Sequence, residues 1–372
     1  MLEIWLTVLK CRFDTLKKPQ RKSTKFRILQ ICALMKKLLS IVCCLFLLTG
    51  HVTAQDPAFS QFYASPLTLN PALTGKFEGL VRVAGNYRDQ WPAISKAFVT
   101  STISVDMPIL RNRLSETDTW GIGVMAMTDR TANGILTSNY ISFSTAYHKG
   151  LDENGMNQIG VGFQGTYAGK RLDGGKLNFE EELDQFGGWT NPTNEPINNR
   201  AVGVNYFDLN AGILYNGSTT GYNNFYLGAS FYHINRPKES FDGGFYLLNP
   251  RLTLHGGGYF PVAENATIHL SAVHSRQAGA TNTVFGGAVA LSANSGDEEN
   301  PTNLYVGSWL RLGDAIIPYI GLEFDDFRLG ATYDVNVSSL KTASQSRGGI
   351  EISLIYIRRA GDGRKTIPCP KF

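Results

Sequence analysis

The sequence predicts an all-β protein, a transmembrane antiparallel β-barrel of about 14 strands of the outer-membrane type. Apolar and polar residues alternate with a period of two in one segment after another from residue 80 onward. These segments run about ten to thirteen residues, which is close to what a tilted strand needs to cross a bilayer and longer than an ordinary globular strand. No stretch after residue 54 approaches about 18 uninterrupted apolar residues, so strands and not helices are expected to cross the membrane.

Residues 35–54 have the pattern of a secretory signal peptide. A basic start at Lys36 is followed by the apolar run Leu38–Leu48 and by a small-residue exit that ends at Ala54. The apolar run is roughly a dozen residues, well short of the ~20 that a membrane-spanning helix needs. We therefore expect cleavage near Ala54–Gln55 and export of the rest of the chain.

Residues 1–34 lie upstream of this signal, and we interpret them as a mis-assigned N-terminal extension. Residues 1–54 hold ten of the 35 Lys and Arg residues and two of the 31 Asp and Glu residues, which leaves 25 basic against 29 acidic side chains. The mature chain is therefore slightly acidic, and no nucleic-acid partner is expected. Of the five cysteines only Cys369 remains, so the exported protein has no internal disulfide.

The segment 157–170 illustrates the alternation. Ile159, Val161 and Phe163 are bulky and apolar, whereas the residues between them are glycines, and Gln164 continues the small or polar face. A soluble β-sandwich also alternates, but its strands are shorter and its sheets have edges to protect. In lipid every backbone group must be paired, which a closed sheet achieves. Strand length and the glycine-rich polar face therefore favour a barrel.

Fourteen segments of this kind can be counted. An even number returns the chain to the side it left, so we expect both termini at the periplasmic side. On this count residues 55–79 form a periplasmic N-terminal segment, 80–358 the barrel and 359–372 a periplasmic tail. The expected strands are 80–91, 98–109, 120–130, 135–149, 157–170, 204–217, 223–235, 251–263, 266–277, 281–293, 302–313, 315–324, 326–336 and 348–358. The long connections lie at the outer end, namely 171–203, 236–250 and 337–347.

One hairpin allows a sharper structural prediction. Asp325 and Asp326 form a two-residue turn between two strands, which places Glu323 directly opposite Arg328 with both side chains facing the lumen. The pair is a candidate charged constriction or plug contact. The alternative is an interior ion pair that only supports the barrel.

No catalytic, cofactor-binding or metal-binding motif stands out. The mature histidines lack metal-ligand spacing, and there is no nucleophile elbow, phosphate-binding glycine loop or cysteine cluster. We therefore expect no enzyme and no cofactor. The acidic run Glu180–Asp184 could attract Ca²⁺ but lacks the ligand spacing of a calcium loop, and a solvated acidic loop is the simpler interpretation.

The long connection 171–201 carries three aromatic residues among polar ones. Phe179, Phe186 and Trp189 either stay exposed for partner contact or fold inward and occlude the barrel, and the sequence leaves both open.

Several segments resemble the PorP/SprF family of type IX secretion system membrane proteins, in the family's order and over essentially the whole mature chain. The first, Gln55–Gly75, is long and distinctive (QDPAFSQFYASPLTLNPALTG). The others are Asn86–Trp91, Ser104–Pro108, Phe225–Pro237, Tyr333–Tyr356 and the Cys369–Phe372 ending.

The resemblance implies an outer-membrane barrel that works with type IX machinery in the periplasm or outer membrane. Its implied partners are that machinery, outer-membrane lipid, and secreted or surface-anchored cargo, including gliding adhesins in some members. It implies no catalytic residues. The main alternative is an outer-membrane channel or hydrophobic-solute transporter, because a barrel of this size can serve either purpose. A soluble surface lectin or adhesin is a third and poorer interpretation.

The segment before the barrel is interrupted by prolines, so we do not expect a strand there. We expect residues 55–75 either to plug the lumen from below or to dock a periplasmic partner. The candidate residues for either role are Phe59, Phe62, Tyr63, Asn70 and Pro71.

Overall fold

The computed structural model describes residues 55–94, 98–110, 113–220, 222–241, 244–293 and 302–359. The expected N-terminal extension and signal peptide, residues 1–54, lie outside the described residues, as does the expected tail apart from Arg359.

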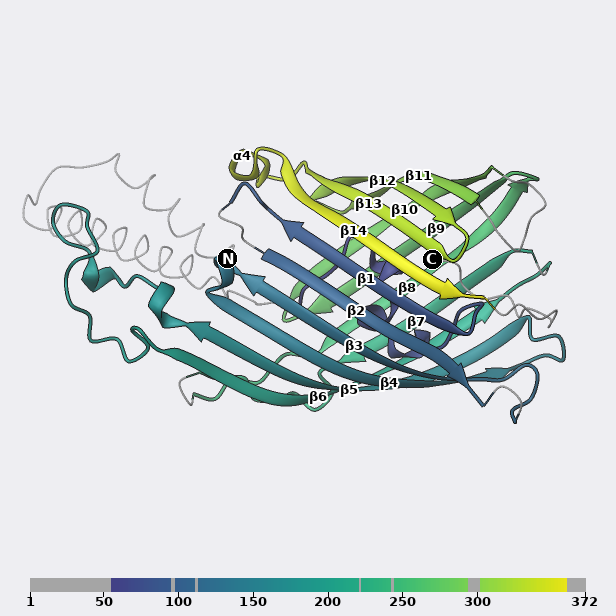
Figure 1. Ribbon diagram of the computed structural model, residues 1–372, viewed down its shortest axis with the longest axis horizontal. Coiled ribbons are helices and arrows are strands. Elements are labelled where there is room, and N and C mark those ends of the chain that lie inside the picture. Colours follow the sequence, from purple (N-terminus) through teal and green to yellow (C-terminus); the bar gives the residue numbers. More distant parts are fainter. Residues whose placement is uncertain are drawn as a thin grey trace, which may run out of the picture. The chain divides into compact units, whose positions relative to one another are not determined.

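The described chain forms a closed barrel of 14 antiparallel strands, which confirms the predicted fold class (Figure 1). Each strand pairs with its neighbours in sequence, and β1 pairs with β14 to close the sheet. No predicted strand boundary differs from the observed one by more than three residues. The strands are β1 Val81–Gln90, β2 Phe98–Ile109, β3 Thr119–Thr131, β4 Leu136–Gly150, β5 Asn157–Asp173, β6 Ala201–Gly217, β7 Asn224–Tyr232, β8 Arg251–Ala263, β9 Ala266–Gln277, β10 Ala280–Ser292, β11 Thr302–Arg311, β12 Ala315–Phe324, β13 Phe327–Asn336 and β14 Arg347–Arg358.

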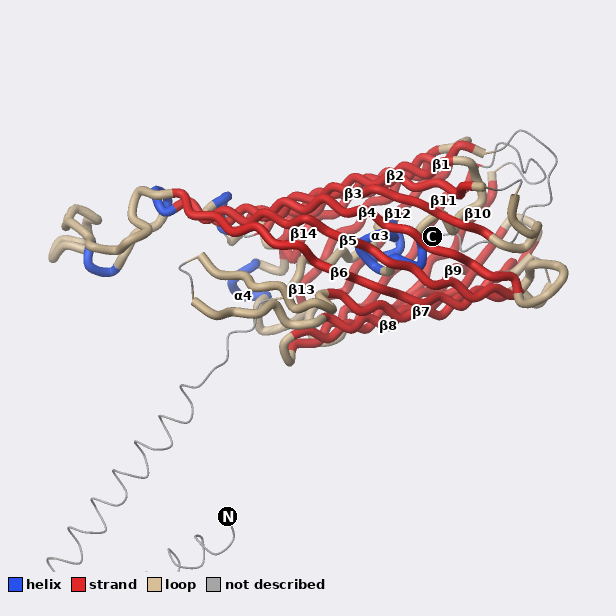
Figure 2. The backbone as a smooth tube through the Cα atoms, turned by 90° about the horizontal axis from the view of Figure 1, so that it is seen from below, coloured by secondary structure: helices blue, strands red, loops and turns tan. Residues whose placement is uncertain are grey.

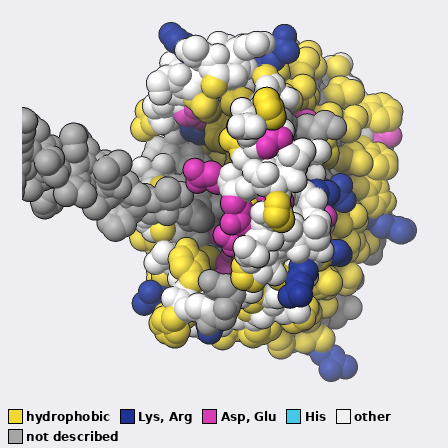
Figure 3. All heavy atoms as spheres, turned by 90° about the vertical axis from the view of Figure 1, so that its left-hand side faces the viewer, with side chains coloured by type: hydrophobic (Ala, Val, Ile, Leu, Met, Phe, Trp, Pro, Cys, Tyr) yellow, Lys and Arg dark blue, Asp and Glu magenta, His cyan; other side chains and the backbone are white. Residues whose placement is uncertain are grey.

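The alternation in sequence becomes an inside-out distribution of polarity. On β4, Ile141 and Phe143 are 62% and 56% exposed, whereas Ser142 and Ser144 between and beside them are each 1% exposed. A soluble sheet buries its apolar face, so this reversal defines an outer surface made for lipid and a polar lumen. Hydrophobic side chains accordingly cover the flank of the barrel in Figure 3. None of the described helices is long and apolar enough to span a membrane.

The two ends of the barrel differ in their connections. The end that carries residues 174–200, 233–250 and 337–346 is called the long-loop end, and the opposite end, with turns such as 264–265 and 325–326, the short-turn end. Short helical turns occur in two of the long loops, namely η4 Gly174–Lys176, η5 Glu180–Glu182 and α4 Lys341–Ser344. A further turn, η3 Ala132–Gly134, joins β3 to β4. Strand β7 stops earlier than predicted because His233 and Arg236 adopt positive φ values of 59° and 44°.

The chain before β1 folds into three short helical turns within the barrel (Figure 2). They are η1 Phe62–Ala64, α3 Pro66–Leu69 and η2 Pro71–Leu73. The last two begin with a proline, which cannot donate to a neighbouring strand. Lumenal side chains accept hydrogen bonds from the backbone of Ser60, Gln61 and Gly75, so this part of the expected N-terminal segment, residues 55–79, lies inside the barrel.

Candidate functional site: a segment that fills the lumen

Residues 55–76, called the lumenal segment below, extend from one end of the barrel to the other. At the long-loop end the Asp56 backbone N–H donates to Gln277 Oε1 at 2.8 Å, on the last residue of β9. Toward the short-turn end the Gly75 N–H donates to Asp106 Oδ2 at 2.7 Å, and Lys76 Nζ donates to Gln158 at the start of β5. The described chain therefore begins at the long-loop end, opposite to the expected position of the N-terminus.

Glu351 on β14 holds one turn of the lumenal segment by its backbone. Its two carboxylate oxygens accept from the Ser60 and Gln61 N–H groups at 2.7 and 2.9 Å. The Gln61 side chain completes the attachment by donating to the Glu351 carbonyl and accepting from Ser353 Oγ at 2.7 Å. Glu351 and Gln61 are essentially inaccessible to solvent, at 1% and 0% exposure, so these hydrogen bonds form in a dry environment where an unpaired partner is costly.

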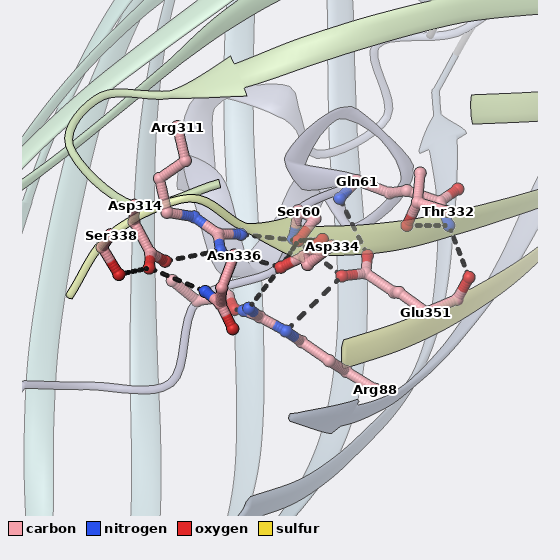
Figure 4. A network of polar contacts seen from close by, with 11 residues as sticks. Ser60, Gln61, Arg88, Arg311, Asp314, Thr332, Asp334, Asn336, Ser338 and Glu351 are labelled. Atoms are coloured by element: carbon pink, nitrogen blue, oxygen red, sulfur yellow. Dashed lines mark hydrogen bonds and ion pairs between the residues drawn. The ribbon is translucent and has the colours of Figure 1, made fainter. Parts of the chain in front are cut away.

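Two arginines and Asp334 extend this attachment to β1, β11 and β13 (Figure 4). Arg311 lies 2.7 Å and Arg88 3.2 Å from the Asp334 carboxylate, and the Ser60 hydroxyl donates to the same carboxylate at 2.8 Å. Arg88 also donates to the Ala58 carbonyl. Strand β1 and strands β11, β13 and β14, which lie on the two sides of the β1–β14 closure, are thus linked through a single stretch of the lumenal segment.

Asn70 fixes the middle of the lumenal segment. Its Oδ1 accepts from the Ala72 N–H at 2.8 Å and caps η2, in which Pro71 occupies the first position, where a missing N–H costs nothing. Its Nδ2 donates to the Ile213 carbonyl on β6 at 2.9 Å and lies 2.9 Å from His255 Nε2 on β8. Asn70 therefore joins a local cap to two strands of the wall.

The three predicted aromatic residues of the segment are buried among the strands. Phe59, Phe62 and Tyr63 are between 5% and 8% exposed, and the Tyr63 ring lies 4.9 Å from Trp309 between ring centroids. A cavity of about 30 Å³ remains beside Tyr63, which is room for about one water molecule. Aromatic rings and short helical turns of the lumenal segment thus occupy the part of the lumen through which a solute would have to pass in an open channel.

An ionic cluster lies where the lumenal segment reaches the long-loop end. The Asp56 carboxylate is 2.7 Å from His233 Nε2 and 3.2 Å from Arg251, and His233 Nδ1 is 3.0 Å from Asp208. Burial lowers the pKa of His233, but the hydrogen bonds and charges of Asp208 and Asp56 outweigh it and raise that pKa to about 9. His233 is therefore a cation at neutral pH and holds Asp56 between two positive groups.

The predicted hairpin pair lies at the short-turn end. Glu323 pairs with Arg328 across β12 and β13, and Arg328 Nη2 lies 3.2 Å from Glu323 Oε1. Glu323 also accepts from the Tyr305 hydroxyl at 2.6 Å and from Arg359 at 3.1 Å. The structure confirms that Glu323 and Arg328 lie together. This pair is separate from the contacts that Glu351 and Asn70 make between the wall and the lumenal segment.

The acidic loop uses its carboxylates within itself. Asp184 accepts from the backbone N–H groups of Phe186 and Gly188, both at 2.8 Å, and from the Thr190 hydroxyl at 2.7 Å. These bonds hold the pKa of Asp184 below its ordinary value. Among the described residues no group of three or more His, Cys, Asp or Glu side chains could hold a metal ion.

Sequence reasoning missed most of the residues that bind the lumenal segment, including Glu351, Asp334, Arg88, Arg311 and His233. The available signal was a charged residue at an inward position of an alternating strand, as at Arg88, Asp334 and Glu351. That signal marks the lumen but does not say which charge meets which segment.

The closed sheet with an apolar outside and a polar, filled lumen defines an outer-membrane β-barrel. Residues 51–356 match the model of a family described as type IX secretion system membrane protein PorP/SprF, and the chain belongs to that family. It is thus an outer-membrane component of the type IX secretion system that associates with this machinery. Family and fold both indicate a secretion membrane protein rather than an enzyme.

Solved barrels are similar at low identity. The monoaromatic hydrocarbon channel TodX, as a ΔS2S3 mutant, is 13% identical with a TM-score of 0.43, covering 79% of this chain and 94% of that chain. The translocator domain of the autotransporter NalP from Neisseria meningitidis is 10% identical with a TM-score of 0.38, covering 79% and 93%. The KdgM porin, in complex with disordered oligogalacturonate, is 8% identical with a TM-score of 0.36, covering 74% and 98%. No curated protein sequence matches the chain.

Proposed function

We propose that this protein is a permanently plugged barrel that supports type IX secretion by binding proteins, and that solutes do not pass through its lumen. The carrying observation is the attachment of residues 55–76 to lumenal side chains from strands all round the wall, such as Asp106 on β2, Ser230 on β7 and Glu351 on β14. A channel or transporter would have to release these buried bonds for each passage event. The lumenal segment, with Phe59, Phe62, Tyr63, Asn70 and Pro71, is therefore the plug in this proposal.

The proposed orientation places the long-loop end outside the cell and the short-turn end in the periplasm, as is usual for bacterial outer-membrane barrels. Cargo, which includes surface-anchored proteins such as gliding adhesins, would then meet the long loops. Periplasmic machinery would meet the short turns and the chain beyond β14, while lipid covers the apolar flank. Cleavage of a signal peptide near Ala54–Gln55 would leave a new N-terminus beside the Asp56 cluster.

Two measurements test the plugged state and the protein-binding role. Purified protein in liposomes is expected to pass no more small sugar than protein-free vesicles, whereas a variant lacking residues 55–75 becomes leaky if its barrel still assembles, which heat-modifiable gel mobility reports. Affinity purification from outer membranes, with mass spectrometry, is expected to recover type IX components or one large surface protein. Solute flux through the intact protein, with no protein partner recovered, would transfer the assignment to a transporter.

A further inference from the structure

Strand β6 extends beyond the end of β7 toward the long-loop end, which leaves part of one edge of β6 open. It pairs with β5 along its whole length, from Ala201 to Gly217, but with β7 only from Ala211 to Gly217. Residues 201–210 therefore have a neighbouring strand on one side only. The step in the rim arises because β7 ends at Tyr232, where His233 turns the chain into a left-handed conformation.

Part of this edge is closed by the chain that follows β7. The Leu209 N–H donates to Asn235 Oδ1, and the Leu209 carbonyl accepts from the Ile234 N–H, both at 3.0 Å. The Phe207 carbonyl accepts from Asn235 Nδ2 at 2.7 Å. Since alternate residues of an antiparallel strand direct their backbone groups to the same side, the odd-numbered residues of this part of β6 face the open edge.

Beyond Asn235, toward the long-loop end, the edge of β6 is unpaired. Within the described part of the chain, the backbone groups of Asn205, Gly203 and Ala201 have no hydrogen-bond partner on this side, and all three residues are exposed. A row of unpaired N–H and C=O groups is a template for one further strand, and proteins normally cover or block such an edge.

The loop beyond this edge presents apolar rings on an ordered turn. Phe186 is 88% and Trp189 51% exposed, although Asp184 and the isolated bridge between Leu183 and Trp189 fix the backbone around them. A rigid, exposed aromatic residue loses little conformational freedom when a partner covers it.

The charge of the same loop selects among partners. Residues 179–195 contain five carboxylates, on Glu180, Glu181, Glu182, Asp184 and Glu195, and no Lys or Arg; the whole loop 174–200, which adds Lys176 and Arg200, keeps a net charge of −3. Carboxylates also gather near the middle of the long-loop face in Figure 3. A second copy of this chain would bring two such acidic loops together, so edge-to-edge pairing of two copies is disfavoured.

We propose that the edge of β6 from Ala201 to Phe207 binds an extended, basic segment of a partner polypeptide by strand addition, with Phe186 and Trp189 as its apolar contacts. The backbone of another chain fits the alternating unpaired donors and acceptors, and basic side chains fit the acidic loop. This inference deepens the proposed function, since it locates the surface for a protein partner at the long-loop end.

The test uses the full protein, purified from outer membranes in detergent, and a fluorescent peptide of about nine residues in which lysine alternates with valine. The peptide is expected to bind with an affinity that falls with added salt, and amide hydrogen exchange in residues 201–207 is expected to slow when it binds. A matched peptide with glutamate in place of lysine should bind at least about tenfold more weakly, because the acidic loop repels it.

Backbone variants separate strand addition from simple charge attraction. The double variant Ala201→Pro with Asn205→Pro removes two edge N–H groups while leaving the β5 side of the strand paired, and should weaken peptide binding about tenfold. The control Ala201→Ser with Asn205→Ala changes the same side chains, keeps both N–H groups and should bind as the parent does. Unchanged heat-modifiable mobility shows that each variant has folded.

Equal binding by the proline and control variants, or binding without slower exchange at residues 201–207, would overturn the strand-addition proposal. A third result would also overturn it: slow amide exchange at this edge before peptide is added, in protein whose intact mass shows that residues before Gln55 are retained. The chain would then cover its own edge. None of these results touches the proposed function, which depends on recovery of type IX components and on the closed lumen.

Discussion

Two irregular segments of this protein are similar in composition and end in opposite environments. The lumenal segment has three prolines and three aromatic residues among polar ones, and the loop 174–200 has two prolines, five asparagines and three aromatic residues. In the lumenal segment Tyr63 is 8% exposed, whereas Phe186 in the loop is 88% exposed.

The difference lies in where the backbone finds its partners. Ser60 and Gln61 donate to Glu351, which is 291 and 290 residues away in sequence, so the lumenal segment is ordered only by the barrel wall. The loop uses its own carboxylates, since Asp184 accepts from backbone groups two and four residues further on. A segment whose hydrogen bonds are local can present its aromatic residues outward, whereas one without local partners must be buried to satisfy them.

The largest expected effect is that of Glu351→Ala. The substitution leaves two buried N–H groups without an acceptor and removes the Glu351 carboxylate 3.9 Å from Arg88, which keeps its contact with Asp334, at a cost of about 3–5 kcal/mol. The unfolding temperature in detergent should fall, and amide exchange in residues 58–63 should accelerate. Glu351→Gln keeps one acceptor and should cost about half as much. Glu180→Ala, which removes an exposed carboxylate from the loop, is the negative control, and equal effects at the two positions would contradict the comparison.

Asn70→Ala should come second, at about 2–3 kcal/mol. It removes the cap of η2 and leaves the Ile213 carbonyl without this donor in the middle of the barrel. The matched control is Pro71→Ala, which keeps the cap and should change stability by less than about 1 kcal/mol. Both are measured by denaturant unfolding of the detergent-solubilised barrel. Stability unaltered by the loss of Asn70 would mean that the wall holds this turn without its side chain.

The barrel could be predicted from the sequence because its information is local. A period of two over ten or more residues defines each strand, and a two-residue turn at Asp325 and Asp326 fixes the register that places Glu323 opposite Arg328. The resemblance of Gln55–Gly75 to a family marked the lumenal segment as important, but its path through the lumen was not predictable. That path depends on side chains from strands at both ends of the chain, such as Arg88 and Asp334, whose meeting requires barrel closure.

The local order of the loop makes Asp184→Ala a test of the other half of the comparison. Loss of this carboxylate should release the turn around Phe186, and chymotrypsin should then cleave after Phe186 or Trp189 several-fold faster, while the unfolding temperature of the barrel stays unchanged. The hydrogen bonds lower the pKa of Asp184, so their contribution is present above its ordinary value of 3.8 and is lost as pH falls further. Thr193→Ala, at a neighbouring loop hydroxyl bonded to Glu181, should have a smaller effect. A lower unfolding temperature in Asp184→Ala would show that the loop also supports the barrel.

The smallest expected effect concerns the end of the lumenal segment beside His233. Its raised pKa means that the contact of protonated His233 with Asp56 is complete below pH 6.5 and is lost as pH rises through about 9. Amide exchange at Asp56, corrected for the intrinsic pH dependence of exchange, should therefore accelerate several-fold between pH 7 and pH 10, while Ser60 and Gln61 stay protected by Glu351. The change is limited because Arg251 keeps its own contact with Asp56 at 3.2 Å. In His233→Gln the corrected exchange rate should stay constant across this range. The same pH dependence in that variant would assign the transition to another group. The lumenal segment would then be held by uncharged packing and by the hydrogen bonds of Glu351.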